Sequence, residues 1–222
     1  LPNLSELVLP PLITNEQLQW LRDEGVLANL TSLSRLLWIG NLTDLSPLEG
    51  LEKLNSLTII TCPGLTDISP LASLTNLTSL VLGNDNLIDI SPLASLQSLT
   101  TLRLGGDSLT DITPLASLSN LTTLKLGGRA LTDFSPLSGL TQLTELSLHY
   151  NSTNLTNIEW ITTLTNLERV DLSLCWELKD IGPVAGLANL KDLNLEGLDL
   201  ADISPVSGLT QLTRLNLRNN SS

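Results

Sequence analysis

One short block recurs at a nearly fixed interval through this chain of 222 residues. It reads Asp, an apolar residue, Ser, Thr or Gly, and then Pro, and its seven copies begin at Asp44, Asp67, Asp89, Asp111, Asp133, Asp180 and Asp202. The intervals are 23, 22, 22, 22, 47 and 22 residues, and an altered copy, Asn157-Ile-Glu-Trp160, divides the 47 into 24 and 23. A fixed period of about 22 residues indicates a solenoid of stacked units.

Residues 77–96 show what one unit can fold into. Leu80 and Leu82 alternate with polar or variable neighbours, which predicts a short strand with one buried face. Ile90, Leu93 and Leu96 are spaced three apart, and Ser before Pro suits a helical turn with Ser as its N-cap. Because only about ten residues are available, we expect a short 3₁₀ turn rather than a long α-helix.

Stacked units of this kind give a parallel sheet on one side and helical turns on the other. The expected buried strand pairs are Leu7/Leu9, Leu36/Trp38, Leu57/Ile59, Leu80/Leu82, Leu102/Leu104, Leu124/Leu126, Leu146/Leu148, Val170/Leu172, Leu193/Leu195 and Leu215/Leu217. At about 4.8 Å per step, ten strands make a sheet about 43 Å long. Helical turns are wider than strands, so we expect the sheet on the concave side.

The spacing of these leucines resembles the leucine-rich repeat consensus, and the Asp-Ile-Ser-Pro-Leu run resembles its bacterial, internalin-like branch. The resemblance extends to about residue 219 and implies an α/β solenoid of horseshoe shape. We expect one leucine-rich repeat domain over residues 1–222, with an enlarged unit at 1–30, regular repeats at 31–218 and a truncated end at 219–222. Both ends interrupt the repeat pattern, which suggests a piece of a longer protein.

The first unit is long enough for a true α-helix near residues 15–24. Thr14 or Asn15 is expected to cap it, and Leu18, Leu21 and Trp20 are available for burial.

The net charge of −12 disfavours nucleic acid and anionic membranes as partners. No stretch approaches the 18 or more consecutive apolar residues of a membrane span, and no leader opens the chain. We therefore expect a monomer with no nucleic-acid partner and no membrane insertion. The resemblance favours a cell-surface or secreted location, while a cytoplasmic one stays open.

Cysteines and aspartates are interpreted as structural, so we expect no metal and no cofactor. Cys62 and Cys175 would lie about 24 Å apart, too far for a disulfide. Each follows its strand at the place where the repeat uses Asn or Cys to hydrogen-bond adjoining turns. We assign the same place to Asn41, Asn151 and Asn220, with Asp85 and Asp107 as variants, whereas Arg129 and Leu198 depart from the pattern. The recurrent aspartates favour local backbone caps over a calcium column, because one carboxylate per repeat supplies too few oxygens.

A hydrolytic triad of Ser147, His149 and Asp171 is the enzymatic alternative. Residues two apart on one strand face are separated by roughly 6.5 Å, beyond Ser–His hydrogen-bond reach, and no oxyanion hole is evident. We therefore predict that the chain is not an enzyme.

The residues flanking each buried pair point out of the sheet and form columns on its concave face. The N-terminal end is apolar there, and the C-terminal end carries mixed charge, as a protein partner requires. The predicted partner-binding residues are Val8, Leu37, Ile39, Ile60, Val81, Arg103, Lys125, Glu145, Ser147, His149, Arg169, Asp171, Asn194, Glu196, Arg214 and Asn216. A slip of one residue in the second strand would turn Trp38 from the core to the cavity.

Two functions stay open. The first, implied by the resemblance, is a non-catalytic recognition module that binds a protein on its concave face. The second is the ligand-sensing region of a larger intracellular bacterial protein with a nucleotide switch. The Cys-Pro-Gly-Leu and Cys-Trp-Glu-Leu turns favour the second.

Overall fold

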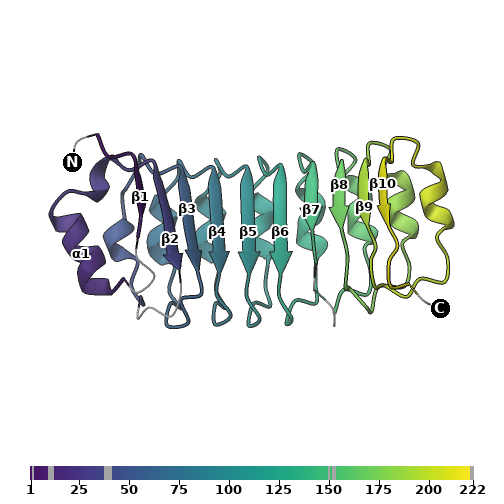
Figure 1. Ribbon diagram of the computed structural model, residues 1–222, viewed down its shortest axis with the longest axis horizontal. Helices are drawn as coiled ribbons and strands as arrows, with labels where there is room; N and C mark the ends of the chain where they lie inside the picture. The colour runs from purple at the N-terminus through teal and green to yellow at the C-terminus, as the bar shows by residue number, and fades with distance from the viewer. Residues whose placement is uncertain (2, 10–12, 38–41, 150, 152–153, 221–222) are drawn as a thin grey trace.

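Ten parallel strands form one sheet in which each strand pairs with the next one along the chain. The computed structural model describes residues 1, 3–9, 13–37, 42–149, 151 and 154–220. Figure 1 shows the strands side by side, with the two termini at opposite ends of the sheet. The strands are β1 (Glu6–Val8), β2 (Ser32–Leu37), β3 (Ser56–Ile60), β4 (Ser79–Gly83), β5 (Thr101–Gly105), β6 (Thr123–Gly127), β7 (Glu145–Ser147), β8 (Arg169–Asp171), β9 (Asp192–Asn194) and β10 (Arg214–Asn216).

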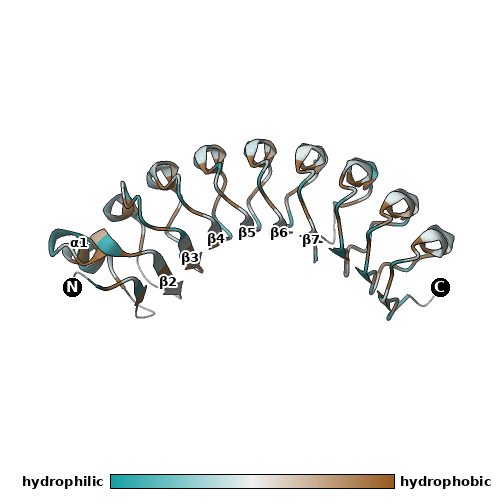
Figure 2. Cartoon of the chain, turned by 90° about the horizontal axis from the view of Figure 1, so that it is seen from above, coloured by the Kyte–Doolittle hydropathy of each residue, from teal (hydrophilic) through white to brown (hydrophobic). Residues whose placement is uncertain are grey.

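Short helical turns connect the strands. One α-helix, α1 (Asn15–Asp23), precedes the 3₁₀ turns η1 (Leu27–Asn29), η2 (Ser46–Leu48), η3 (Ser69–Ser73), η4 (Ser91–Ser95), η5 (Thr113–Ser117), η6 (Ser135–Gly139), η7 (Glu159–Thr163), η8 (Gly182–Gly186) and η9 (Ser204–Gly208). Figure 2 shows the stack as an arc with the helical turns outside and the strands inside. The predicted solenoid with a concave sheet and short 3₁₀ turns is therefore confirmed.

The core is a continuous column of leucines between sheet and turns. In β4, Leu80 and Leu82 are fully buried, while Val81 between them is half-buried on the other face. The predicted pairs from Leu57/Ile59 to Leu193/Leu195 are all buried. Leu215 in the last strand is 39% exposed because, among the described residues, no strand follows β10.

The recurrent aspartates are backbone caps, as predicted. In each of the seven blocks the Asp side chain accepts a hydrogen bond from the backbone N–H two residues later, as from Ser91 to Asp89 at 2.8 Å. Asn157 does the same for Glu159 in the altered copy. The prediction that Ser is the N-cap is wrong: in η4 the N-cap is Ile90, without a side-chain cap bond, and Pro lies in the first turn.

A ladder of residues, one after each strand, hydrogen-bonds adjoining turns, and several of its predicted members differ in the structure. After β4 the turn is one residue shorter than after β3, so the buried place is taken by Asn84, which donates to the Leu65 carbonyl oxygen. Gly106 and Gly128 take it in the next two units. After β9 the buried Leu198 keeps the original spacing. Asp85, Asp107 and Arg129 are exposed, so the predicted places of the two aspartates are wrong, and Arg129 is not a departure from the ladder.

The other ladder residues that the structure describes lie at their predicted places, and Asn41 lies outside the described residues. Asn151 donates to the carbonyl oxygens of Leu126 and Leu148, and Asn220 donates to those of Leu195 and Leu217. Cys62 and Cys175 are buried and are not disulfide-bonded.

The enlarged first unit contains the predicted α-helix. The Thr14 hydroxyl oxygen accepts the Gln17 backbone N–H, and the Gln17 side-chain oxygen accepts the Thr14 backbone N–H, so the two residues form a capping box at the start of α1. Leu18 is buried and Leu21 packs against the core. Trp20 is 58% exposed, so its predicted burial is wrong.

Strand β2 contains an irregularity that shifts its register. Leu33 pairs with Leu57, whereas Leu36 pairs with Ile59, so β2 contains one residue more than β3 between the two pairs. The register of the predicted pair Leu36/Trp38 is therefore wrong. Leu33 is the buried residue opposite Leu57, and Leu36 lies opposite Ile59, the second buried residue of β3. Trp38 lies outside the described residues.

Candidate functional site

The strand register arranges the outward residues of the sheet in columns across the concave face. The first column holds Glu6, Ser32, Ser56, Ser79, Thr101, Thr123, Glu145, Arg169, Asp192 and Arg214. The second holds Thr58, Val81, Arg103, Lys125, Ser147, Asp171, Asn194 and Asn216, and Val8 has the corresponding place in β1. The third holds Ile60, Gly83, Gly105 and Gly127.

At the N-terminal end the second and third columns carry apolar side chains, next to Thr58 and to the serines of the first column. Val8 is 52% exposed, and Ile60 and Val81 are half-buried on the same face. The backbone of Leu37 pairs with Ile60, which places Leu37 at the third column. Ile39 lies outside the described residues.

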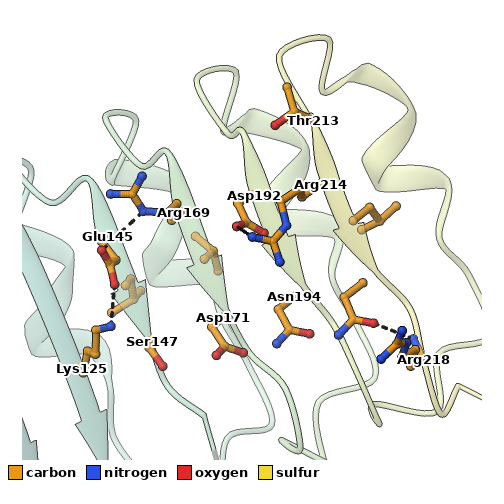
Figure 3. A pocket seen from close by; sticks show the side chains of 14 residues that line it. Lys125, Glu145, Ser147, Arg169, Asp171, Asp192, Asn194, Thr213, Arg214 and Arg218 are labelled. Atoms are coloured by element: carbon orange, nitrogen blue, oxygen red, sulfur yellow. Dashed lines mark hydrogen bonds and ion pairs between the residues drawn. The ribbon is translucent and has the colours of Figure 1, made fainter.

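Two hollows lie over the columns. The first hollow, of about 860 Å³, covers β3 to β6 and is lined by Ile60, Val81, Arg103 and His149 among others. The second hollow, of about 680 Å³, covers β7 to β10 and is shown in Figure 3. Lys125 and Ser147 line both, so the two hollows form one continuous trough.

Ion pairs link neighbouring strands in the second hollow. Glu145 pairs with Lys125 at 2.8 Å and with Arg169 at 3.4 Å, as the dashed lines in Figure 3 show. Asp192 pairs with Arg214 at 3.3 Å. The hydrogen bond from Lys125 is the main cause that lowers the pKa of Glu145 below its usual value, against the opposing effect of partial burial. These ion pairs connect side chains of β6, β7 and β8 and, separately, of β9 and β10.

A second network joins β7 and β8. The hydroxyl of the buried Ser173 donates to Oδ1 of Asp171 at 2.6 Å, and Nδ1 of His149 lies 2.8 Å from the same hydroxyl oxygen. His149 thus contacts Ser173 and not Ser147. The serine lies between acid and imidazole and is 3% exposed, so this order offers no accessible nucleophile next to a base.

Three predicted binding residues also end their strands. The side-chain oxygens of Asp171, Asn194 and Asn216 accept the backbone N–H two residues later, from Ser173, Glu196 and Arg218. Strands β8 to β10 end at this column, as β7 does at Ser147, whereas β4 to β6 continue for two more residues.

These features can be compared with known proteins. No protein-family model matches the chain, and no curated protein matches it either. The crystal structure of an internalin, InlF, from Listeria monocytogenes matches 98% of this chain with a TM-score of 0.78 and 35% sequence identity. This chain is an internalin-like leucine-rich repeat protein.

The internalin-like chain spans 62% of the InlF structure. A second internalin of Listeria monocytogenes, InlC2, is 29% identical over 96% of this chain and 80% of its own, with a TM-score of 0.63. A complex of TLR13 with a single-stranded RNA, ssRNA13, matches 98% of this chain and 36% of TLR13 at 24% identity, with a TM-score of 0.66. This last likeness supports the fold alone. The two internalins support a protein-interaction module in general terms.

Metal ligands, membrane-spanning helices and reactive thiols are other features that could point to a function of the internalin-like chain. No group of three or more His, Cys, Asp or Glu side chains that could hold a metal ion occurs within the described ranges. Over the same part of the chain, no helix is long and apolar enough to cross a membrane. Burial raises the pKa of the Cys62 thiol and raises that of Cys175 to about 12, so neither is a reactive thiolate at neutral pH.

The described members of the predicted set all lie on or beside the concave face. His149 lines the first hollow. Glu196 follows β9, at the C-terminal end of the sheet, and accepts hydrogen bonds from Asn216 and Asn219. Sequence reasoning missed Ser173, which connects His149 to Asp171 across two strands. Its position directly after the buried Leu172 is the one available signal.

Proposed function

We propose that this chain is a non-catalytic recognition module that binds a protein partner on its concave face. The observation that carries the proposal is the distribution of charge. The described residues of the first and second columns include four basic side chains and four acidic ones: Arg103, Lys125, Arg169 and Arg214, and Glu6, Glu145, Asp171 and Asp192. The whole chain has 11 basic and 23 acidic residues, which leaves 7 and 19 elsewhere. The net charge of −12 therefore lies outside these columns.

A balanced face on an acidic body suits a protein surface of mixed charge. Paired charges of both signs fix the orientation of a partner and its on-rate, and like charges opposed across the interface exclude others. Phosphate chains need clustered cations instead, and three of the four basic side chains are already paired with carboxylates. We therefore propose a protein partner and no nucleic acid.

The ion pairs of the concave face contribute little to folding. Arg169 is 55% exposed and Lys125 is 46% exposed, and pairs of this kind are worth about 0 to 1 kcal/mol. The two pairs around Glu145 do, however, link side chains of three successive strands, β6 to β8, on the surface that is offered for contact. Val8, Ile60 and Val81 supply apolar anchors at the other end.

A photo-crosslinking residue in place of Ser147 tests the proposal, because Ser147 lines both hollows. The matched control carries the same residue at Ala116, which is exposed on the convex turn η5. Proteins linked from position 147 are identified and purified, and their affinities are measured for Ser147→Arg and Ala116→Arg. We expect at least tenfold weaker binding for Ser147→Arg alone. Equal loss in both variants, or links from position 116 only, would place the partner elsewhere.

A further inference from the structure

Arg103 differs from the other basic residues of the columns. It is exposed in the first hollow, in register between Val81 and Lys125. Lys125, Arg169 and Arg214 each pair with a carboxylate, whereas Arg103 forms no ion pair with any residue that the structure describes. Asp85 and Asp107 line the same hollow, but Asp107 is paired with Arg129. Among the described residues, the Arg103 guanidinium thus has no carboxylate within ion-pair distance, and it is exposed to whatever fills the hollow.

The backbone of Gly105 and Gly127 forms the floor of the first hollow beside Arg103, and the packing of the fold does not require glycine at either position. A Cβ on Gly105 would lie 3.8 Å from the Gly127 carbonyl oxygen, and one on Gly127 would lie 3.9 Å from that of His149. Both are ordinary contacts, and neither glycine has positive φ. By contrast, a Cβ on the adjacent Gly106 would come within 2.6 Å of the Asn84 carbonyl oxygen. The hollow thus keeps its depth where a side chain would fit.

The walls of the hollow set what can lie on this floor. Ile60 and Val81 flank it on the N-terminal side, and His149 lines it on the other. Two strand steps make the floor about 10 Å wide, enough for a flat ring but not for a folded element. Because Lys125 and Ser147 continue the hollow into the second one, the occupant can extend as a chain across both.

We propose that the first hollow receives a segment of the protein partner that bears a carboxylate next to an aromatic ring. This inference rests on the proposed function and adds the chemistry of one subsite. The carboxylate pairs with the Arg103 guanidinium, whose planar donors match it in a two-bond geometry. The ring lies on the backbone of Gly105 and Gly127 beside Ile60.

N-acetyl-tryptophan and N-acetyl-tryptophanamide test the inference as probes, because they share a ring and differ in the carboxylate. Each is titrated into the ¹⁵N-labelled protein, and the amide signals of Gly105 and Gly127 are followed. We expect saturable shifts at both glycines with N-acetyl-tryptophan, and about tenfold weaker binding of the uncharged probe. Arg103→Gln should reduce the difference between the probes to less than about twofold.

A pair of matched double variants separates the floor from general effects of glycine replacement. Gly105→Ala with Gly127→Ala should weaken N-acetyl-tryptophan at least tenfold. Gly186→Ala with Gly208→Ala, on convex turns where an added Cβ meets nothing within 4 Å, should leave it unchanged. Equal affinity for both probes, no shift at the glycines, or equal effects of the double variants would overturn the inference.

The purified partner separates this inference from the proposed function. If Ser147→Arg weakens the partner and Arg103→Gln does not, the concave face binds and the subsite is wrong. If neither weakens it, the proposed function fails as well. Arg103-dependent binding of an oligouridylate in place of the tryptophan probes would assign the hollow to nucleic acid and also overturn the inference.

Discussion

The rings of Phe134 and Trp160 stack with centroids 6.3 Å apart and an angle of 18° between their planes. Both residues depart from the repeat: Phe134 stands where other blocks have Ile or Leu, and Trp160 stands where they have Pro. The two departures lie in adjacent units, and the stacked rings add an aromatic contact between the segments of η6 and η7.

Replacing Trp160 tests how much this ring stack contributes to stability. Trp160→Ala removes the stacked ring and should lower the free energy of unfolding by about 2 to 3 kcal/mol, somewhat less than for a fully buried aromatic residue. Trp160→Phe keeps a ring and removes an Nε1–H that has no hydrogen-bond partner among the described residues, so we expect a change below about 1 kcal/mol. Urea unfolding measures both. A Phe variant as unstable as the Ala variant would contradict the stacking argument.

Two neighbouring glycines should respond in opposite ways to the same change. Gly106→Ala brings a Cβ to 2.6 Å from a backbone oxygen and should destabilise the chain by about 1 to 3 kcal/mol. Gly105→Ala meets only an ordinary contact and lowers the entropy of the unfolded chain, so it should be neutral or stabilising by up to about 1 kcal/mol. Denaturant midpoints of the two variants decide this. The prediction is wrong if both variants lose stability equally.

The period of the sequence was sufficient to predict the sheet, its concave side and the aspartate caps, because these depend on contacts inside one unit or between identical neighbours. Asp89 bonds to Ser91 two residues away, so the sequence contains the whole interaction. The place of Asn84 was not predictable from the consensus spacing, since the shortened turn moves the buried position by one residue. The extra residue in β2 was hidden because Leu33 and Leu36 both satisfy a strand pattern.

The columns of the candidate site were predictable for the same reason, since alternation along each strand fixes which residues point outward. The contacts among them were not. Glu145 pairs with Arg169 from a strand 24 residues away, and Ser173 connects His149 with Asp171, through side-chain conformations that spacing does not specify. That Arg103 forms no ion pair with any described residue is evident only once the neighbouring pairs are known.

The aspartate caps predict how stability depends on pH. Backbone and side-chain hydrogen bonds from the serine two residues later lower the pKa of Asp67, Asp89, Asp133 and Asp202 below the ordinary value of 3.8. A lowered pKa in the folded state means that the stabilisation is complete above pH 3.8 and is lost as pH falls through the lower, folded values. The midpoint temperature of thermal unfolding should therefore decrease as the pH is lowered below about 4.

Asparagine at these four positions is the matched control, because Asn157 already caps Glu159 in the altered block and does not titrate in this range. The variant with all four aspartates replaced by asparagine should show a shallower decline of the thermal midpoint between pH 4 and pH 2 than the parent. Parallel acid curves for the two proteins would show that these caps are not the source of the decline.

The hydrogen-bond order around Ser173 fixes the tautomer of His149. Its single hydroxyl hydrogen is donated to the Asp171 carboxylate at 2.6 Å, so the Ser173 oxygen can only accept from the imidazole. Neutral His149 must then carry its hydrogen on Nδ1, the less common form in solution. Long-range ¹H–¹⁵N correlation spectra at alkaline pH distinguish the two nitrogens directly. Ser173→Ala removes the acceptor and should restore the Nε2–H form, whereas an Nε2–H imidazole in the parent chain would show that the order of donors is reversed.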